Sequence, residues 1–166
     1  MEKILVTGCA GFIGMNVTKS LLKRGYNILG IDNINDFYDV NLKRNRLEKL
    51  SEAKDFKFIK VDISDALSLD QLFDSFKPDK VVNLAAQAGV RYSLKHPDKF
   101  IKSNINGFMN ILESCRKHNV GGLIYASSSS VYGANSKHPF SVKDRIDKPI
   151  SIYAATKAAN ELMAHS

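Results

Sequence analysis

The stretch TGCAGFIG, residues 7–14, decides the fold of this chain because it places three glycines where a strand turns into a helix. Residues 3–8 read KILVTG and are predicted to form a buried strand. Residues 12–24 carry apolar side chains along one side, which predicts an amphipathic helix that stops at Gly25. A strand, a glycine-rich turn and a helix in this order are typical of a domain that binds a nucleotide.

The three glycines predict a cradle for phosphate groups. Gly8, Gly11 and Gly14 allow the main chain to turn tightly and to approach a pyrophosphate. Phe12 and Ile13 begin the helix, and the N–H groups at that positive end attract the charge of a pyrophosphate. We therefore expect a dinucleotide to bind at this turn.

An acidic residue follows the turn at the spacing that dinucleotide binding requires. Asp32 ends the second predicted strand, residues 27–32, eighteen residues past Gly14. A carboxylate at this place accepts hydrogen bonds from the ribose of an adenosine, and its charge repels a 2′-phosphate. Asn33 comes next, where an arginine would accommodate that phosphate. The pattern therefore predicts NAD as the cofactor in preference to NADP.

The rest of the chain continues to alternate strands with helices. Further strands are predicted at residues 56–63, 79–86 and 121–129, and further helices at 39–53, 68–76, 96–118 and from Ser151 onward. Residues 133–149 contain glycine, asparagine, serine and proline and are predicted to form a loop. Five strands in this alternation predict an α/β fold: a doubly wound parallel sheet of the Rossmann type in one domain, residues 1–166.

The ends of two predicted strands carry further candidate contacts to the cofactor. Asp62 and Ile63 end the third strand, and Asp62 either accepts a hydrogen bond from the adenine amino group or caps the next helix. The fourth strand ends at the edge where ligands collect in such sheets, with Leu84, Ala85, Ala86 and Gln87.

A tyrosine and a lysine near the end of the chain form a candidate catalytic pair. Tyr153 and Lys157, in SIYAATK, lie four residues apart and share one face of the last predicted helix. A tyrosine can take the hydroxyl proton of a carbinol during hydride transfer, but its ionisation at pH 7 costs about 4 kcal/mol. A cation about 5 Å away contributes roughly 3 kcal/mol at an effective dielectric near 20. Lys157 is one such cation, and a bound oxidised nicotinamide is a second.

Four serines follow the fifth predicted strand. Ser127, Ser128, Ser129 and Ser130 are expected beside the cofactor if the sheet assembles as described. A hydroxyl there can hydrogen-bond the oxygen of a substrate and help to pass its proton. Nucleotide fold, serines and the tyrosine–lysine pair together predict an enzyme.

These motifs resemble the extended short-chain dehydrogenase/reductase family. The resemblance rests on TGCAGFIG, NLAAQ, SSSSVYG and YAATK together with Asp32, and it runs from the first strand to the last residue. DNINDFYDVNLKRNRL, NLAAQAGVRYSLKHP and SVYGANSKHPFS are most similar to the UDP-glucuronate 4-epimerases, which supply capsule and cell-wall sugars in bacteria. The resemblance implies Ser128 as the hydroxyl of a triad, Tyr153 as its base and Lys157 as the partner of that base.

The resemblance also implies contacts outside the triad. Asn104 in SNING and Ser127 are expected beside the cofactor, and Lys157 is expected to bind the nicotinamide ribose. Gln87 and the serines Ser128, Ser129 and Ser130 are expected at the substrate. Arg91 is a candidate for reaching an anionic substrate, with a surface arginine as the alternative.

The implied reaction is oxidation of UDP-glucuronate at C4 and hydride return to the other face of the 4-keto intermediate, which gives UDP-galacturonate. Epimerisation of UDP-glucose or of a UDP-N-acetylhexosamine is the alternative substrate assignment. Related dehydratases carry an Asp-Glu pair directly after the catalytic hydroxyl, and decarboxylases often keep a Glu there. Ser129 and Ser130 occupy these places, which disfavours both reactions.

Members of the family are about twice as long as this chain, and the further half supplies much of the nucleotide-sugar site. The chain ends at AANELMAHS, so we expect an incomplete NAD-binding domain without the C-terminal nucleotide-sugar-binding domain. An alternative to an enzyme is therefore a NAD-binding fragment that turns over no substrate on its own. The resemblance also implies a homodimer through helices at residues 98–118 and 152–166.

The composition argues against several other classes of protein. The net charge is +7, but no basic run is long enough for a nucleic-acid arm. The predicted helix at residues 39–53 is expected to carry four basic residues on a solvated face: Lys43, Arg44, Arg46 and Lys49. No apolar run is long enough to span a bilayer. We expect neither a nucleic-acid nor a membrane partner.

The cysteines and histidines indicate neither disulfides nor a metal site. Cys9 and Cys115 lie far apart without a CxxC pattern, so we expect reduced thiols in a cytoplasmic protein. Cys9 fills a small-residue position in the glycine-rich turn. The four histidines lack the spacing of metal ligands.

Overall fold

The computed structural model describes residues 1–166, which divide into two compact units. The first unit consists of Met1–Ala85 and Asn110–Tyr125, and we call it the sheet unit. The second consists of Ala86–Met109 and Ala126–Ser166, and we call it the helical unit. Each is described by itself.

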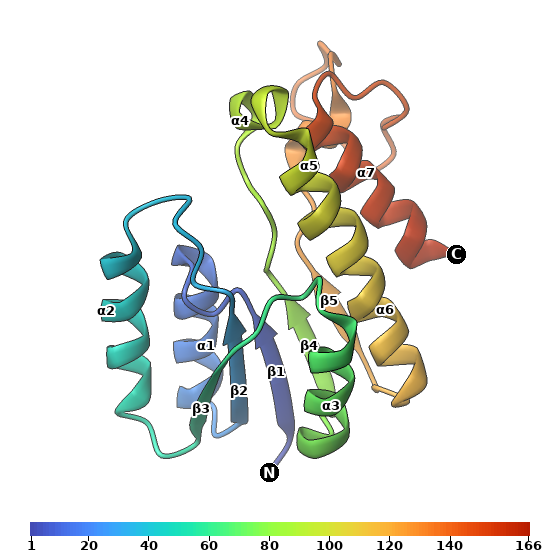
Figure 1. Ribbon diagram of the computed structural model, residues 1–166. Helices are drawn as coiled ribbons and strands as arrows, with labels where there is room; N and C mark the ends of the chain where they lie inside the picture. The colour runs from blue at the N-terminus through green and yellow to red at the C-terminus, as the bar shows by residue number, and fades with distance from the viewer. The chain divides into compact units, whose positions relative to one another are not determined.

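The sheet unit is built on five parallel strands (Figure 1). Their order across the sheet is β3-β2-β1-β4-β5, so the direction of winding reverses between β1 and β4. The strands are β1 (Lys3–Thr7), β2 (Asn27–Asp32), β3 (Phe56–Lys60), β4 (Lys80–Asn83) and β5 (Leu123–Tyr125). This order confirms the predicted doubly wound parallel sheet.

Helices cover both faces of the sheet (Figure 1), as the apolar strands require. On one face, α1 (Phe12–Lys23) and α2 (Val40–Ser51) pack on a core that includes Ile4 and Val6 of β1. On the other face, α3 (Ala66–Phe76) and α6 (Phe108–Lys117) pack on a core that includes Leu5. Successive residues of β1 thus point to opposite faces, and all three are buried.

Three predicted strands are shorter than expected. The third ends at Lys60, the fourth at Asn83 and the fifth at Tyr125, so the serines follow β5 as irregular chain. β4 ends where the N–H groups of Leu84 and Ala85 donate to the hydroxyl of Thr7, although the N–H of Leu84 also reaches the main-chain oxygen of Thr7 at 3.3 Å. β5 pairs with β4 over three residues only, from Leu123 to Tyr125.

Acidic side chains set where two helices begin. Asp39 caps α2 by accepting a 2.9 Å hydrogen bond from the main-chain N of Asn41, so this helix starts one residue later than expected. Asp65 caps α3 by accepting a 3.1 Å bond from the N of Ser68, and the helix starts earlier than expected. Gly25, at φ 82°, follows the end of α1 as predicted.

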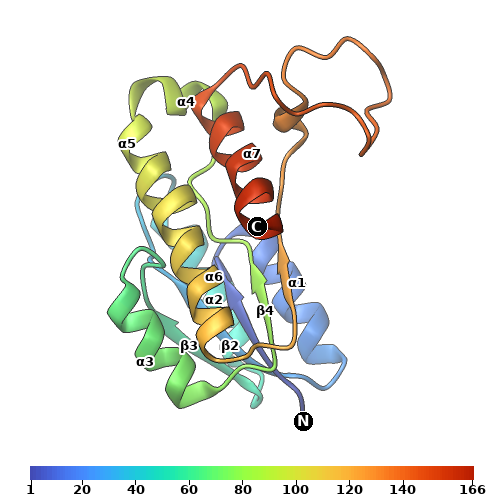
Figure 2. The same ribbon diagram turned by 90° about the vertical axis from the view of Figure 1, so that its right-hand side faces the viewer.

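In the helical unit, all other regular elements pack on α7, Ile152–His165 (Figure 2). They are α4 (Val90–Lys95), α5 (Pro97–Phe100), the π-helical segment η1 (Ile101–Gly107) and the 3₁₀ turn η2 (Ser129–Tyr132). The single helix expected at residues 96–118 is therefore α5, η1 and α6 in succession. α4 was not predicted, because a six-residue helix after Gly89, at φ 108°, leaves little periodicity in the sequence.

The loop predicted at residues 133–149 contains no helix or strand.

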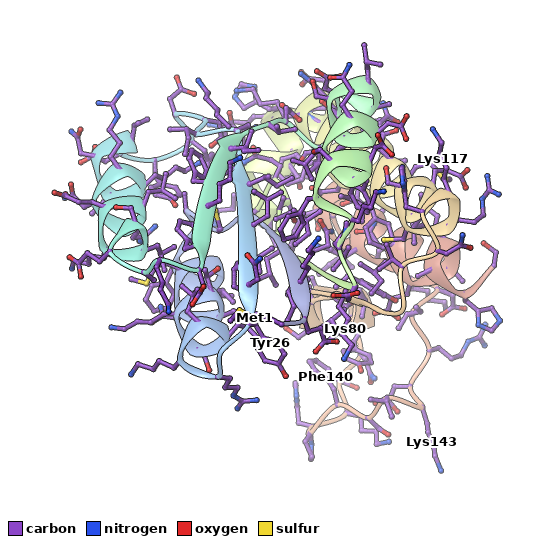
Figure 3. All side chains as sticks on the ribbon, turned by 90° about the horizontal axis from the view of Figure 1, so that it is seen from below. Met1, Tyr26, Lys80, Lys117, Phe140 and Lys143 are labelled. Atoms are coloured by element: carbon purple, nitrogen blue, oxygen red, sulfur yellow. The ribbon has the colours of Figure 1, made fainter.

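At the end of the sheet where the strands begin, Met1, Tyr26 and Lys80 lie near one another (Figure 3), and the ammonium of Lys80 is 2.9 Å from a carboxylate oxygen of Glu2. None of the helices combines the length and the apolar composition that crossing a membrane requires.

Candidate functional site

The glycine-rich turn after β1 requires glycine for reasons of packing. Gly8 has φ 69°, and a Cβ added to it would lie 2.8 Å from the N of Ala85. A Cβ on Gly14 would lie 2.0 Å from the main-chain oxygen of Gly8. These contacts are too short for any side chain, so glycine at both positions lets the turn approach the chain after β4 and the first turn of α1.

The same turn leaves N–H groups available to an anion. Gly11 is the N-cap of α1, no side chain caps the helix, and its first turn contains no acidic residue. The N–H groups of Phe12, Ile13 and Gly14 have no acceptor in the structure. Phe12 and Ile13 are 71% and 61% exposed. Unpaired donors at the positive end of a twelve-residue helix fit a pyrophosphate.

Thr7 organises this turn and was missed by sequence reasoning. Its Oγ1 donates a 2.6 Å hydrogen bond to Oδ1 of Asn83 and accepts bonds from the N–H groups of Leu84 (3.1 Å) and Ala85 (3.0 Å). The end of β4 is thereby fixed beside Gly8. Polar residues at the ends of two otherwise apolar strands were the available signal.

Asp32 ends β2 as predicted and is 8% exposed. Its Oδ1 accepts a 2.8 Å hydrogen bond from the N of Ile34. The neighbouring Asn33 donates from Nδ2 to Oδ2 of Asp62 at 3.2 Å, which ties the ends of β2 and β3 together. The structure therefore brings together the three polar residues that were predicted at the adenosine end of a dinucleotide.

Asp62 also shapes the turn that follows β3. Its Oδ1 accepts hydrogen bonds from the N (2.9 Å) and Oγ (2.8 Å) of Ser64, whereas the cap of α3 is Asp65. Ile63 is 4% exposed and belongs to the core, and its main-chain oxygen accepts from Nδ2 of Asn110 at 3.0 Å. The side chain of Ile63 thus serves packing.

The expectation that four basic residues of α2 are solvated was wrong for two of them. Arg44 and Lys49 are exposed, but Lys43 is 4% exposed and Arg46 is half-buried. Arg46 donates from Nη1 to the oxygen of Ala10 (3.2 Å) and to the hydroxyl of Tyr38 (2.9 Å). The preceding loop supplies partners that turn these side chains inward.

The two thiols are not reactive groups. Burial, followed by the Asp32 carboxylate, raises the pKa of the Cys9 thiol far above its ordinary value. Burial raises the pKa of the Cys115 thiol to about 11. Both thiols stay protonated at neutral pH, so neither is a nucleophile. No three His, Cys, Asp or Glu side chains gather as metal ligands do.

In the helical unit, α7 carries the predicted tyrosine–lysine pair. Ser151 caps the helix by accepting a 3.0 Å hydrogen bond from the N of Ala154, and the helix begins at Ile152. Lys157 is 6% exposed, and its Nζ donates a 2.9 Å bond to the main-chain oxygen of Ala126. Burial lowers the pKa of Lys157 to about 8. The half-buried Tyr153 stands edge-on to the ring of Phe100 at 6.1 Å between centroids.

The serine segment begins directly after Ala126. Ser128 is extended and caps η2, with its Oγ accepting a 3.2 Å bond from the N of Ser130. Ser127 donates a short hydrogen bond to the carboxylate of Glu161, one turn beyond Lys157 on α7. A hollow of about 600 Å³ is lined by residues that include Ser127, Ser128, Ser129, Tyr132, Asp144 and Glu161.

Asn104 connects three parts of the helical unit. Its side chain accepts from the N of Gln87 (2.8 Å) and donates to the oxygen of Gln87 (3.1 Å) and to Oγ1 of Thr156 (3.0 Å). Asn160 donates from Nδ2 to the main-chain oxygen of Asn104 at 2.6 Å. These buried bonds fix η1, the chain after β4 and α7 to one another. Thr156 and Asn160 were missed, because nothing in the sequence pairs them with Asn104.

Three of the predicted substrate contacts make no side-chain hydrogen bond in the structure. Arg91 lies exposed on α4, and no ion pair or hydrogen bond holds its side chain. The side chains of Ser129 and Ser130, in η2, make no hydrogen bond.

Comparison with known proteins gives matches along the whole chain. The model of the family described as GDP-mannose 4,6 dehydratase matches residues 5–166. "Protein CapI" of Staphylococcus aureus is 56% identical over 164 residues, which cover 99% of this chain and 49% of that protein. "UDP-glucuronate 4-epimerase 3" of Arabidopsis thaliana is 50% identical over 164 residues, or 98% of this chain and 38% of that protein.

Comparison with solved structures also gives matches along nearly the whole chain. The UDP-Glc/GlcNAc 4-epimerase of Campylobacter jejuni is 28% identical with a TM-score of 0.91, over 99% of this chain and 48% of that one. The UDP-glucuronic acid 4-epimerase of Bacillus cereus, in complex with UDP-glucuronic acid and NAD, is 35% identical with a TM-score of 0.87, over 98% and 51%. The chain thus spans about half the length of these proteins.

Proposed function

The chain belongs to the family described as GDP-mannose 4,6 dehydratase, and we propose that within it the chain is the NAD-binding part of a UDP-sugar 4-epimerase that acts on UDP-glucuronate. One observation carries the proposal. α7 holds Lys157 buried, with its ammonium on the main-chain oxygen of Ala126. Lys157 lies one helical turn from Tyr153, and Ala126 directly precedes the serine segment. A phenol, a buried ammonium and hydroxyl groups are the set that reversible oxidation of a carbinol needs.

We propose a role for each of these groups. Tyr153 Oη takes the proton from the C4 hydroxyl and later returns it. Lys157 Nζ, held by Ala126, favours the ionised phenol. Ser128 Oγ hydrogen-bonds the C4 oxygen. Bound NAD would accept hydride from C4 and give it back to the other face of the 4-keto sugar, so it is not consumed.

The residues that we propose as contacts to NAD form two sets, one in each unit taken by itself. From the sheet unit they are Gly8, Gly11, Phe12, Ile13, Gly14, Asp32, Asn33, Asp62, Ile63, Leu84 and Ala85, and from the helical unit Ala86, Gln87, Asn104, Ser127, Tyr153 and Lys157. The unpaired N–H groups at the start of α1 support the pyrophosphate end, and the buried carboxylate of Asp32 supports the ribose end.

Epimerisation is preferred to dehydration although the family's description names a dehydratase. Elimination of water requires an acid and a base beside the catalytic hydroxyl. Ser129 and Ser130 stand directly after Ser128, and neither is acidic. The carboxylate of Glu161 lines the same hollow, but it is held by Ser127.

The substrate assignment rests on identity with named relatives. The Arabidopsis thaliana UDP-glucuronate 4-epimerase is 50% identical along nearly the whole chain, which supports UDP-glucuronate. UDP-glucose or a UDP-N-acetylhexosamine is the alternative, which the UDP-Glc/GlcNAc 4-epimerase of Campylobacter jejuni supports at 28% identity. Gln87, Ser128, Ser129 and Ser130 are our proposed substrate contacts, and Arg91 is proposed only for the anionic sugar.

We also propose a homodimer through η1–α6 and α7. Ile101 of η1 and Met109 of α6 are exposed at 46% and 43% and lie about two turns apart along this continuous helical segment. Leu162 on α7 is exposed at 65%. Apolar side chains on both helices fit burial against a second copy.

A hybrid protein tests the function. Residues 1–166 are followed by the C-terminal half of the Staphylococcus aureus relative, and the hybrid receives UDP-glucuronate and UDP-glucose side by side with NAD. We expect UDP-galacturonate as the main product. Preference for the neutral sugar would move the assignment to the alternative. Loss of water or of CO₂ from the substrate would contradict epimerisation.

The alternative that the chain is a NAD-binding fragment without turnover of its own is tested with the 166 residues alone. Because the chain spans about half of its relatives, we propose that by itself it binds NAD without turning over a UDP-sugar. Calorimetry measures the binding, and product analysis measures the turnover. Full activity of the 166 residues would contradict this proposal.

A further inference from the structure

α2 buries a lysine against the acid that ends β2. Lys43 is 4% exposed, although the surrounding sequence LKRNRLEKL is strongly polar. Its ammonium lies 3.6 Å from Oδ1 of Asp32 and donates a 2.9 Å hydrogen bond to Oδ1 of Asn35. It also lies 5.0 Å from the ring centre of Tyr38. A lysine is buried in this way only when its charge is compensated.

The ion pair between Lys43 and Asp32 involves only one of the two carboxylate oxygens of Asp32. Oδ1 accepts from the N of Ile34 and lies beside Lys43, whereas Oδ2 accepts no hydrogen bond within the chain. A carboxylate held by one oxygen presents the second in a fixed direction. Oδ2 is therefore available to a ribose hydroxyl, while the charge of the group is balanced by Lys43.

A second cation of α2 lies against the same loop. Arg46 is three residues beyond Lys43, and its guanidinium is 5.6 Å from the ring centre of Tyr38. It holds the oxygen of Ala10, which belongs to the glycine-rich turn. The adenosine end of the site thus contains the carboxylates of Asp32 and Asp62 and the two cations of α2, of which Lys43 lies directly against Asp32.

We infer that Lys43 sets the cofactor selectivity of this site: it cancels the charge of Asp32, so that NAD is selected through hydrogen bonds to Oδ2 and NADP binds as a secondary cofactor. The inference rests on the proposed dinucleotide binding. An unpaired carboxylate about 6 Å from a 2′-phosphate would weaken binding roughly a hundredfold at an effective dielectric near 20. An ammonium at a similar distance offsets most of this, which leaves a preference for NAD of about tenfold.

Calorimetric titration of NAD and NADP into five forms of the chain tests the inference. They are the wild type, Lys43→Met, Asp32→Asn, the double variant Asp32→Asn/Lys43→Met, and Lys49→Met as a control that removes an exposed charge from the same helix. Lys43→Met should raise the preference for NAD over NADP about tenfold above wild type. Asp32→Asn should bind NADP at least tenfold more tightly than wild type, and the double variant should lose most of this gain. The control should match wild type.

Equal affinity of Asp32→Asn and of the double variant for NADP would overturn the inference, because the gain would then need no cation. An unchanged preference in a folded Lys43→Met variant would overturn it as well. If Lys43→Met alone does not fold, the double variant, which removes both charges of the pair, still decides the question. Absence of NAD binding to the wild type would contradict the proposed function itself, and the inference with it.

Discussion

The ammonium of Lys157 donates a 2.9 Å hydrogen bond to the main-chain oxygen of Ala126, the residue directly before the serine segment. The bond fixes α7 to that segment and holds the charge one turn from Tyr153. Sequence spacing alone placed Tyr153 and Lys157 on one helix face, but it left open whether the lysine points into solvent. The structure buries it, and burial is what makes a single cation effective beside a phenol.

Substitution of Lys157 by methionine should change how stability depends on pH. The folded chain holds the pKa of Lys157 at about 8, below the ordinary value of 10.5. Below pH 8 the proton is bound in both states, whereas between pH 8 and 10.5 the unfolded chain binds more protons, so wild-type stability rises with pH in this window. The unfolding free energy of Lys157→Met minus that of wild type should therefore fall by about 3 kcal/mol from pH 7 to 10.5, because only the wild type gains stability from this lysine. Urea unfolding at several pH values measures it.

Lys95→Met is the matched control, because Lys95 is exposed on α4 of the same unit. Its unfolding free energy should run parallel to that of wild type over the same pH window. A constant difference for Lys157→Met would mean that the lysine keeps its ordinary pKa and is solvated.

Replacement of Tyr153 by phenylalanine should separate stability from chemistry. The hydroxyl of Tyr153 makes no hydrogen bond in the structure, while its ring packs edge-on to Phe100. Tyr153→Phe keeps the ring, so the unfolding free energy should stay within about 0.5 kcal/mol of wild type. Turnover of the hybrid protein should fall about 10²- to 10⁴-fold through loss of the base. Turnover close to that of wild type would remove Tyr153 from its proposed role.

The sequence located every strand of the sheet, most clearly the three central strands β1, β2 and β4, which are apolar runs buried on two faces. Ile4, Leu5 and Val6 illustrate this, since no solvated face interrupts the pattern. The ends of the strands were harder to predict. β4 stops where Leu84 and Ala85 turn to Thr7, which lies 77 and 78 positions earlier, and no local pattern reports that contact.

The candidate site was predictable where its geometry is local. The glycine turn and the tyrosine–lysine face depend on spacings of three or four residues, which a helix or a turn converts directly into position. Lys43 was misjudged because the residues around it are typical of a solvated helix, whereas its partners lie outside that helix: Asp32 ends β2 and Asn35 belongs to the loop that follows. The link between Asn104 and Thr156 spans 52 positions and was equally invisible.

Removal of the Asn104 side chain should destabilise the helical unit. Asn104→Ala leaves the N and O of Gln87 without their partners, and each unpaired buried group costs about 1–3 kcal/mol. We expect a loss of about 2–4 kcal/mol in unfolding free energy by urea denaturation, with faster hydrogen exchange at the amide of Gln87. Asn106→Ala, an exposed asparagine of the same π-helical segment, is the control and should be near neutral. Equal effects of the two variants would show that the network contributes nothing specific.

Substitution of Gly14 by alanine should disrupt the turn that begins α1. The added Cβ would lie 2.0 Å from the main-chain oxygen of Gly8, and no flexible side chain is there to give way. The gain in helix propensity, up to about 1 kcal/mol, is smaller than the cost of moving main chain, so the variant should lose roughly 3 kcal/mol and bind NAD at least tenfold more weakly. Gly122→Ala is the matched control, since its Cβ would meet only Cγ of Lys80 at 3.9 Å. Thermal unfolding and calorimetry on both variants measure the two effects. A Gly14→Ala variant with wild-type stability would show that the turn and α1 can separate without cost.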